Sequence, residues 1–183
     1  MGEDELVAEA QAGVQGAMVE LYHRHRGRII GYVLRMTGDP DLADEVFAAT
    51  FVAFFDHLER YQSRGHLDAY LLRIARSRLA DEVKQRGRLG GRDRACPATE
   101  SDPVDPTPGP VESMAASELA GRVDEALRRL PEPLREVVAL RLFEGLDYAT
   151  IAQIVGAGEA TVRSRMRYAL AALRKFANAL PEP

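Results

Sequence analysis

The feature that most constrains this chain is the stretch from residue 146 to residue 173, which holds two apolar patterns separated by glycines. The first pattern follows the i, i+3, i+4 spacing that places side chains on one face of a helix, at Ile151, Ile154 and Val155. Gly156-Ala157-Gly158 then interrupts it, and glycine tolerates the left-handed backbone that a sharp helix end requires. The stretch therefore predicts two helices joined by a tight turn.

The second of these helices, beginning at about Glu159, has two different faces on a wheel of about 100° per residue. The apolar arc, which we expect to face the core, holds Val162, Met166, Ala169, Leu170 and Leu173. The opposite arc is small, polar and cationic, and holds Ala160, Thr161, Ser164, Arg167 and Tyr168, with Arg163 and Arg165 beside it. Small side chains allow approach to a major groove, where arginine binds guanine or phosphate. We interpret the pair as a helix-turn-helix, although a solvated basic helix would have the same composition.

The distribution of charge bears on the choice between these two interpretations. The chain has 183 residues and a net charge of −4. Residues 67–94 carry +4 and residues 121–183 carry +2, whereas residues 1–66 and 95–120 each carry −5. Because screening limits the reach of a charge to about 10 Å, local excess governs attraction to phosphates. Two separate basic segments therefore remain compatible with nucleic-acid binding.

The remaining composition indicates a soluble protein of the cytoplasm. The acidic start Met1–Glu5 precedes no apolar run, so we expect no signal peptide, and no stretch reaches membrane-spanning length. Hydrophobic residues make up 46% of the chain, as is ordinary for a packed globular protein. The single cysteine, Cys96, excludes an internal disulfide and suits a reducing compartment.

The rest of the chain predicts an all-α protein with two small domains, because no segment alternates with the period of a strand. The expected helices outside the opening stretch cover residues 6–36 as two helices, 39–58, 67–86, 118–130 and 134–143. The first domain would span residues 1–88 and the second residues 118–183. Residues 89–117 contain five of the ten prolines, a composition typical of a flexible linker, and they are acidic.

Several segments have the pattern of a known family. They are LVAEAQAG at 6–13, LY at 21–22, LADEVFAATF at 42–51, YLLRIARSRLADEVKQR at 70–86, LRRLPEPLREVVALRLFEGLDYATIAQIVG at 127–156 and TVRSRMRYALAALR at 161–174. Together they resemble the bacterial extracytoplasmic-function (ECF, group four) sigma-70 family, and they cover nearly everything outside the linker. The resemblance implies a promoter-specificity subunit of RNA polymerase. It also implies core polymerase (clamp and flap), promoter DNA and an anti-sigma factor as partners.

The resemblance also implies roles for particular residues. In the second domain, contacts with the duplex of the minus-thirty-five element fall on Thr161, Arg163, Ser164, Arg165, Arg167 and Tyr168. In the first domain, contacts with the melted minus-ten element fall on Tyr61, Arg64, His66, Tyr70, Arg73, Arg76, Ser77 and Lys84. An aromatic side chain there suits stacking of an unpaired base, and the cations suit phosphates. Contacts with the polymerase clamp fall on Asp44, Glu45, Ala48, Ala49 and Phe51.

One departure from the family pattern keeps a second hypothesis open. Ala48-Ala49 stands where family members commonly have Gln-Glu, so the chain could be a sigma-like interaction protein with weak or no polymerase binding. A third hypothesis is an ordinary helix-turn-helix repressor or activator. The chain lacks an evident dimerisation segment after Asn178, which such proteins usually need.

Other chemistry is not indicated. His23 and His25 are two residues apart on an expected helix and point in different directions, and no histidine lies at metal-ligand spacing from a cluster of further ligands. No phosphate-binding glycine loop or nucleophile motif is present in the sequence. We therefore expect no metal, no cofactor and no enzymatic activity.

Overall fold

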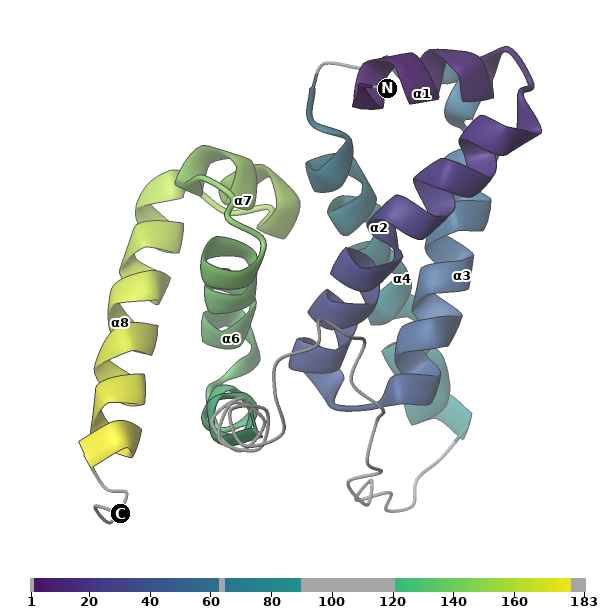
Figure 1. The fold of residues 1–183 in the computed structure, drawn as a ribbon. Coiled ribbons are helices and arrows are strands. Elements are labelled where there is room, and N and C mark those ends of the chain that lie inside the picture. Colours follow the sequence, from purple (N-terminus) through teal and green to yellow (C-terminus); the bar gives the residue numbers. More distant parts are fainter. Residues whose placement is uncertain (1, 63–64, 90–120, 179–183) are drawn as a thin grey trace, which may run out of the picture.

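The computed structural model describes residues 2–62, 65–89 and 121–178, and within these ranges every element is helical and no strand occurs (Figure 1). The expected all-α fold is confirmed. Residues 90–117 of the predicted linker, among them Cys96, and also Arg64 lie outside the described residues, and the exact domain bounds stay a prediction. In the described part of the chain, no helix has the length and apolar character needed to cross a membrane.

The N-terminal half is built from helices α1 (Glu3–Gln11), α2 (Gln15–Thr37), α3 (Pro40–Asp56) and α4 (Leu67–Leu89), with a 3-10 turn at Leu58–Arg60. Helix α2 ends at Gly38, whose φ of 73° is the left-handed conformation that favours glycine. Asp39 then caps α3, its carboxylate accepting the N–H of Leu42 at 3.0 Å. Helices α2, α3 and α4 pack side by side, and α1 lies across one end of them (Figure 1).

The C-terminal half begins with a helical segment at residues 121–128, followed by α6 (Glu132–Val138), η2 (Ala139–Phe143), α7 (Tyr148–Val155) and α8 (Glu159–Asn178). The single helix expected over residues 134–143 is in fact α6 followed by a π-helical turn, η2. There the N–H of Glu144 bonds to the carbonyl of Ala139 at 3.2 Å, five residues back. Neither glycine nor proline marks this change in the sequence, so the apolar pattern alone could not reveal it.

The helix-turn-helix is confirmed as α7, a turn and α8. Gly156 ends α7 with a φ of 67°, and Asp147 caps its start by accepting the N–H of Thr150 at 2.7 Å. That backbone hydrogen bond lowers the pKa of Asp147. The inward arc of α8 is confirmed at Val162, Met166 and Ala169, which are buried, and Leu173 is half-buried.

The expectation for Leu170 is wrong, because its side chain is 38% exposed. At about 100° per residue, Leu170 lies roughly 70° from the centre of the stripe formed by Val162, Met166, Ala169 and Leu173. The helical wheel therefore assigned one residue too many to the buried face of α8.

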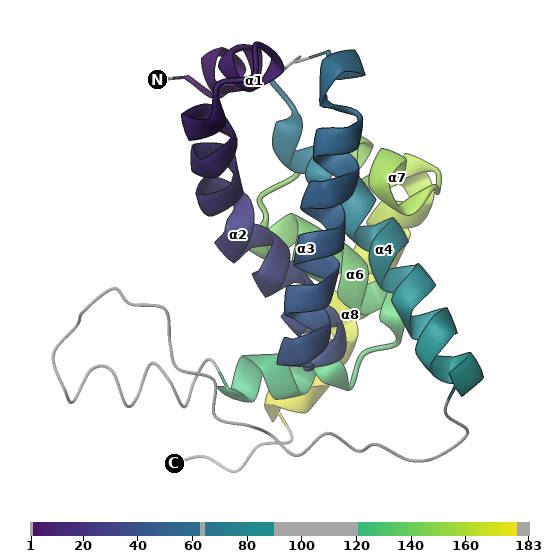
Figure 2. The same cartoon turned by 90° about the vertical axis from the view of Figure 1, so that its right-hand side faces the viewer.

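The two halves contact each other along two lines. Helix α7 lies against α4, and α6 lies against α2 (Figure 2). Buried side chains from both halves form one continuous cluster that includes Tyr32, Leu72, Val137 and Ile151. The helix-turn-helix is thus held against the N-terminal bundle.

Candidate nucleic-acid interface

Two tyrosines form the centre of the predicted minus-ten surface. The rings of Tyr61 and Tyr70 lie 4.8 Å apart between centroids and are tilted by 36°. Both contact the ring of Phe54, at 5.9 and 6.3 Å, and Phe54 is fully buried in the bundle. The tyrosines are half-buried, so each packs on the core with its inner side and lines a pocket with its outer side.

Basic side chains border these rings. The guanidinium of Arg73 lies 5.3 Å from the centroid of the Tyr70 ring, and His66 lines the same pocket of about 300 Å³. Gln11, which the sequence did not single out, holds the loop by donating to the carbonyls of Leu58 at 2.9 Å and Tyr61 at 2.7 Å. Aromatic faces beside cations can stack an unpaired base and neutralise its phosphates.

The structure divides the rest of the predicted minus-ten set. Ser77 is exposed and lines a neighbouring hollow of about 360 Å³ together with Tyr70 and Arg73. Lys84 is exposed and lies with Arg76 in a separate cavity of about 440 Å³, where α4 meets α6. Five of the predicted residues, Tyr61, His66, Tyr70, Arg73 and Ser77, are therefore contiguous.

Arg76 is occupied by a carboxylate from the other half of the chain. Its Nε donates to Oε1 of Glu136 on α6 at 2.7 Å, and the hydroxyl of Tyr32 donates to the same oxygen at 3.0 Å. Glu136 is only 4% exposed. Burial, with the neighbouring Glu136, raises the pKa of Tyr32 well above 10, so its hydroxyl remains a donor. The sequence did not single out Glu136, which follows Arg135 and directly precedes the apolar run at 137–140.

The outward face of α8 is presented to solvent. Thr161, Arg167 and Tyr168 are exposed, and Ser164 and Arg165 are half-buried. Arg163 is exposed but engaged: its Nε donates to Glu159 at 3.1 Å and its guanidinium lies 4.5 Å from the Tyr148 ring centroid.

Arg167 is in a different position from Arg163. Its guanidinium lies 5.4 Å from the ring centroid of Tyr168, and no carboxylate in the described part of the chain forms an ion pair with it. Arg167 is thus the more available cation for a base edge.

The predicted polymerase face lies on α3. Asp44, Glu45 and Ala48 are exposed and Ala49 is half-buried, and Val52, 62% exposed, extends the same face by one turn. The role predicted for Phe51 is wrong. Its side chain is 2% exposed and packs against the rings of Tyr22, Phe47, Phe54 and Phe55, so it supports α3 from inside.

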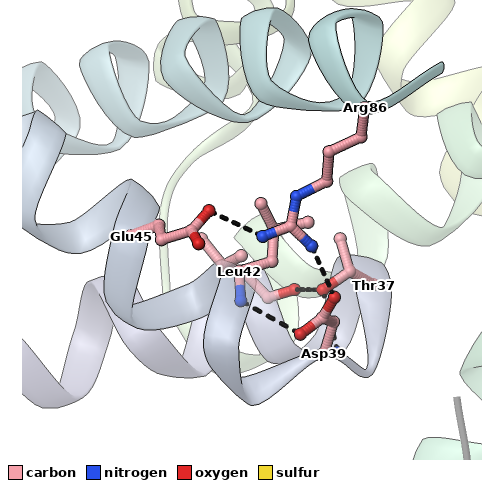
Figure 3. Close-up of polar contacts among 6 residues, drawn as sticks. Thr37, Asp39, Leu42, Glu45 and Arg86 are labelled. Atoms are coloured by element: carbon pink, nitrogen blue, oxygen red, sulfur yellow. Dashed lines mark hydrogen bonds and ion pairs between the residues drawn. The ribbon is translucent and has the colours of Figure 1, made fainter. Parts of the chain in front are cut away.

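Arg86 connects this face to the last turns of α4 (Figure 3). Its two terminal nitrogens donate to Glu45 at 2.6 Å and to Asp39 at 2.9 Å. Asp39 is also the cap of α3, so one guanidinium bridges the cap and a side chain of the exposed face. The hydrogen bond that Arg86 donates to Glu45 is the largest cause that raises the pKa of Arg86. Arg86 therefore orients Glu45 relative to α4.

A buried histidine ties three helices together. His25 on α2 is 3% exposed; its Nδ1 lies 2.9 Å from Oδ1 of Asp68 on α4, and its Nε2 lies 3.6 Å from Oε1 of Glu3 on α1. Burial lowers the pKa of His25. Ligand atoms of the three side chains lie within 4.8 Å of one another, close enough for a metal ion. Arg28 forms an ion pair with Asp68, and its positive charge would repel a metal ion at this position. The expected absence of a metal stays a prediction.

The Sigma-70 region 2 family matches residues 21–89, and the Sigma-70, region 4 family matches residues 120–173. The chain belongs to the sigma-70 family. The region 2 match runs from within α2 to the end of α4 and contains the tyrosine pocket and the α3 face. The region 4 match contains the helix-turn-helix.

Relatives and solved structures agree with this sigma-70 assignment. The chain is 31% identical over 167 residues to the ECF RNA polymerase sigma factor SigE of Mycolicibacterium smegmatis, covering 90% of this chain and 64% of that protein. It is 29% identical over 173 residues to SigK of Mycobacterium tuberculosis, covering 93% and 91%. The chain thus spans less than two thirds of SigE.

Two solved structures share the fold of this sigma-70 protein. CnrH, solved in complex with the cytosolic domain of CnrY, superimposes with a TM-score of 0.70 at 25% identity, covering 98% of this chain and all of that one. RpoE of Bartonella quintana, solved with the anti-sigma factor NepR, has a TM-score of 0.69 at 19% identity, covering 88% and 97%.

Proposed function

We propose that this sigma-70 protein directs promoter-specific initiation by bacterial RNA polymerase in the cytoplasm, acting as a specificity subunit and not as an enzyme. Residues 1–88 would open the minus-ten element and residues 118–183 would bind the minus-thirty-five element as duplex. The observation that carries the proposal is the presence in one chain of two complementary surfaces. One is an aromatic pocket with a cationic border, suited to an unpaired base, and the other is a helix-turn-helix with an exposed cationic face.

Within this proposal each surface has its own DNA. Tyr61 and Tyr70 would stack a flipped base, with His66, Arg73 and Ser77 along the adjoining strand. On α8, Arg167 would read a base edge, while Thr161, Arg163, Ser164, Arg165 and Tyr168 would contribute contacts around it.

The exposed face of α3 would bind the polymerase clamp, and the C-terminal half would bind the flap. That face combines the acids Asp44 and Glu45 with an apolar strip formed by Ala48, Ala49 and Val52. An anti-sigma factor is a further proposed partner, since CnrH was solved with CnrY and RpoE with the anti-sigma factor NepR.

The alternative is a sigma-like interaction protein with weak or no core polymerase binding. The same apolar strip favours it, because alanine methyl groups cannot make the polar contacts that a Gln-Glu pair would offer at these two positions. A regulator with an apolar patch would suit this strip as well as a polymerase surface would.

Run-off transcription with purified core polymerase on a promoter library, with and without the protein, tests the two functions. Specific transcripts that depend on the protein would support the sigma function. Val52→Asp should then weaken core binding, because it places a charge on the proposed interface. Val19→Asp, at a residue of α2 that is 54% exposed, is the matched control and should leave binding unchanged. Absence of both transcripts and core binding would favour the interaction protein.

A further inference from the structure

Helix α1 lies across one end of the N-terminal bundle and is fixed to it by one face (Figure 1). Leu6, Val7 and Ala10 on this face are at most 1% exposed. At the start of the helix, a carboxylate oxygen of Glu3 lies 3.6 Å from the Nε2 of His25 on α2. Buried side chains one turn apart fix the rotation of a helix about its own axis. The remaining side chains of α1 therefore leave the helix in defined directions.

The last residue of α1, Gln11, contacts the turn that leads into Tyr61. Its Nε2 donates to the carbonyl of Leu58 at 2.9 Å and to the carbonyl of Tyr61 at 2.7 Å. A carboxamide nitrogen has two hydrogens, so these two bonds use its whole donor capacity. The carbonyl of Leu58 also accepts the N–H of Tyr61 at 3.1 Å. One side-chain group from α1 thus joins the first residue of the 3-10 turn to the residue that follows the turn.

Tyr61 is thereby held both at its backbone and at its ring. The ring lies 5.9 Å from that of Phe54 and 4.8 Å from that of Tyr70. The next residue, Gln62, lines the same pocket as Tyr61. A binding site requires its groups to be held within about 0.5 Å and 10–20° of the productive geometry. The backbone position at Tyr61 therefore decides how its ring is presented to a base.

Gln11 lies outside the part of the chain that matches the family. The Sigma-70 region 2 match begins at residue 21, within α2, whereas the pocket lies inside the match. Gln11 is 47 and 50 positions away from the two carbonyls that it binds. It is exposed, so its replacement removes little packing. Its contacts orient the loop and contribute little to the core.

We propose that Gln11 is a positioning residue for base capture, through which α1 sets the orientation in which Tyr61 receives an unpaired base. The inference rests on the proposed function, because it takes the tyrosine pocket as the site of that base. It makes α1 part of the single-strand site without any contact between α1 and DNA. A group at position 11 that cannot donate hydrogen bonds would leave the carbonyls of Leu58 and Tyr61 free to move.

Three substitutions of similar length separate the donor from the rest of the side chain. Gln11→Lys keeps N–H donors, Gln11→Met has none, and Gln11→Glu places acceptors against the two carbonyl oxygens. Lysine, methionine, glutamate and glutamine have similar helix propensities, so α1 should form in every variant. Ala8→Glu and Ala8→Lys, on the exposed side of α1 one turn earlier, are matched controls for the effect of charge near the end of the helix.

The measured quantity is the preference for a base over an abasic site. The probes are a labelled minus-ten non-template oligonucleotide, with its sequence taken from the run-off library, and copies that are abasic at one position at a time. In the unaltered chain the captured position should show a preference of about fivefold or more. Gln11→Glu should reduce this preference to about twofold or less, Gln11→Met should give an intermediate value, and Gln11→Lys should retain most of it. Binding of the minus-thirty-five duplex should be unchanged in all three variants.

The same abasic profile in Gln11→Glu and in the unaltered chain would overturn the positioning role. An equal loss in Gln11→Lys and Gln11→Glu would also overturn it, and so would a loss of the same size in the Ala8 variants. Protein-dependent transcripts in the run-off assay report the sigma function separately, so that function can stand while the positioning role fails. If no position of the oligonucleotide is sensitive to base removal in the unaltered chain, the pocket does not capture a base and the inference fails with that assignment.

Discussion

Tyr32→Phe removes one hydroxyl from the contact between the two halves and changes little else. The side chain of Tyr32 is fully buried, and its hydroxyl donates to Glu136 at 3.0 Å. Phenylalanine fills the same space, so no large cavity forms. A hydrogen bond to a charged acceptor contributes about 1.5–3 kcal/mol. Since Glu136 keeps Arg76 as a partner, the loss should fall near the lower end, at about 1.5–2 kcal/mol in the free energy of unfolding.

The measurement is urea unfolding of the variant beside Tyr22→Phe, whose ring is half-buried against Phe47 and Phe51 and whose hydroxyl has no hydrogen bond to the described residues. Combining Tyr32→Phe with Glu136→Gln in a double-mutant cycle should give a coupling energy of about 1 kcal/mol. If the two effects simply add, or if Tyr32→Phe costs no more than Tyr22→Phe, the hydroxyl does not hold the halves together and the reasoning is refuted.

Three other predictions concern separate parts of the molecule. Arg167→Ala should weaken minus-thirty-five duplex binding by about 1–3 kcal/mol on the preferred sequence and by less on other sequences. Arg163→Ala should weaken duplex binding less, because Glu159 already accepts a hydrogen bond from that guanidinium. If a binding titration shows equal losses for Arg167→Ala on all sequences, Arg167 contacts phosphate alone. Arg86→Gln should weaken core polymerase binding severalfold. Arg86→Lys should weaken it less, since lysine can still pair with one of the two acids. Equal defects of the two variants in a pull-down titration would argue against the orientation of Glu45 by the charge at position 86. Because burial lowers the pKa of His25, its stabilising effect is present above about pH 6.5 and is lost as the pH falls through the lowered value; urea unfolding from about pH 5 to 8 should show a flatter profile for His25→Gln, and an unchanged profile would assign the dependence to other groups.

The helix-turn-helix could be predicted from the sequence because its determinants are local. The spacing of Ile151, Ile154 and Val155, and the glycine after them, act within a few residues, and the structure confirms both. Periodicity was less informative where a residue lies at the edge of a stripe, as at Leu170. The polymerase-binding role of Phe51 came from the family resemblance alone, and the aromatic cluster around its side chain places Phe51 in the core.

The contacts between the halves could not be predicted, because they join residues that no local pattern relates. Tyr32 and Glu136 are 104 positions apart, and a glutamate at the start of an apolar run carries no sign of its partner. His25 is a similar case: its spacing from His23 argued against a shared metal, but Glu3 and Asp68 approach it only after α1 and α4 have packed on α2. The tyrosine pocket was predicted on the N-terminal side alone, since its other wall belongs to α7.

The positions of the tyrosines also make their intrinsic fluorescence a probe of the protein's conformation. The chain has six tyrosines and no tryptophan, so its near-ultraviolet fluorescence comes from tyrosine alone. Tyr61 and Tyr70 line the pocket that α7 closes, and Tyr32 lies where α6 meets α2. Separation of the halves and stacking of a base would each change the surroundings of these rings. Their emission therefore reports both events in the unlabelled protein.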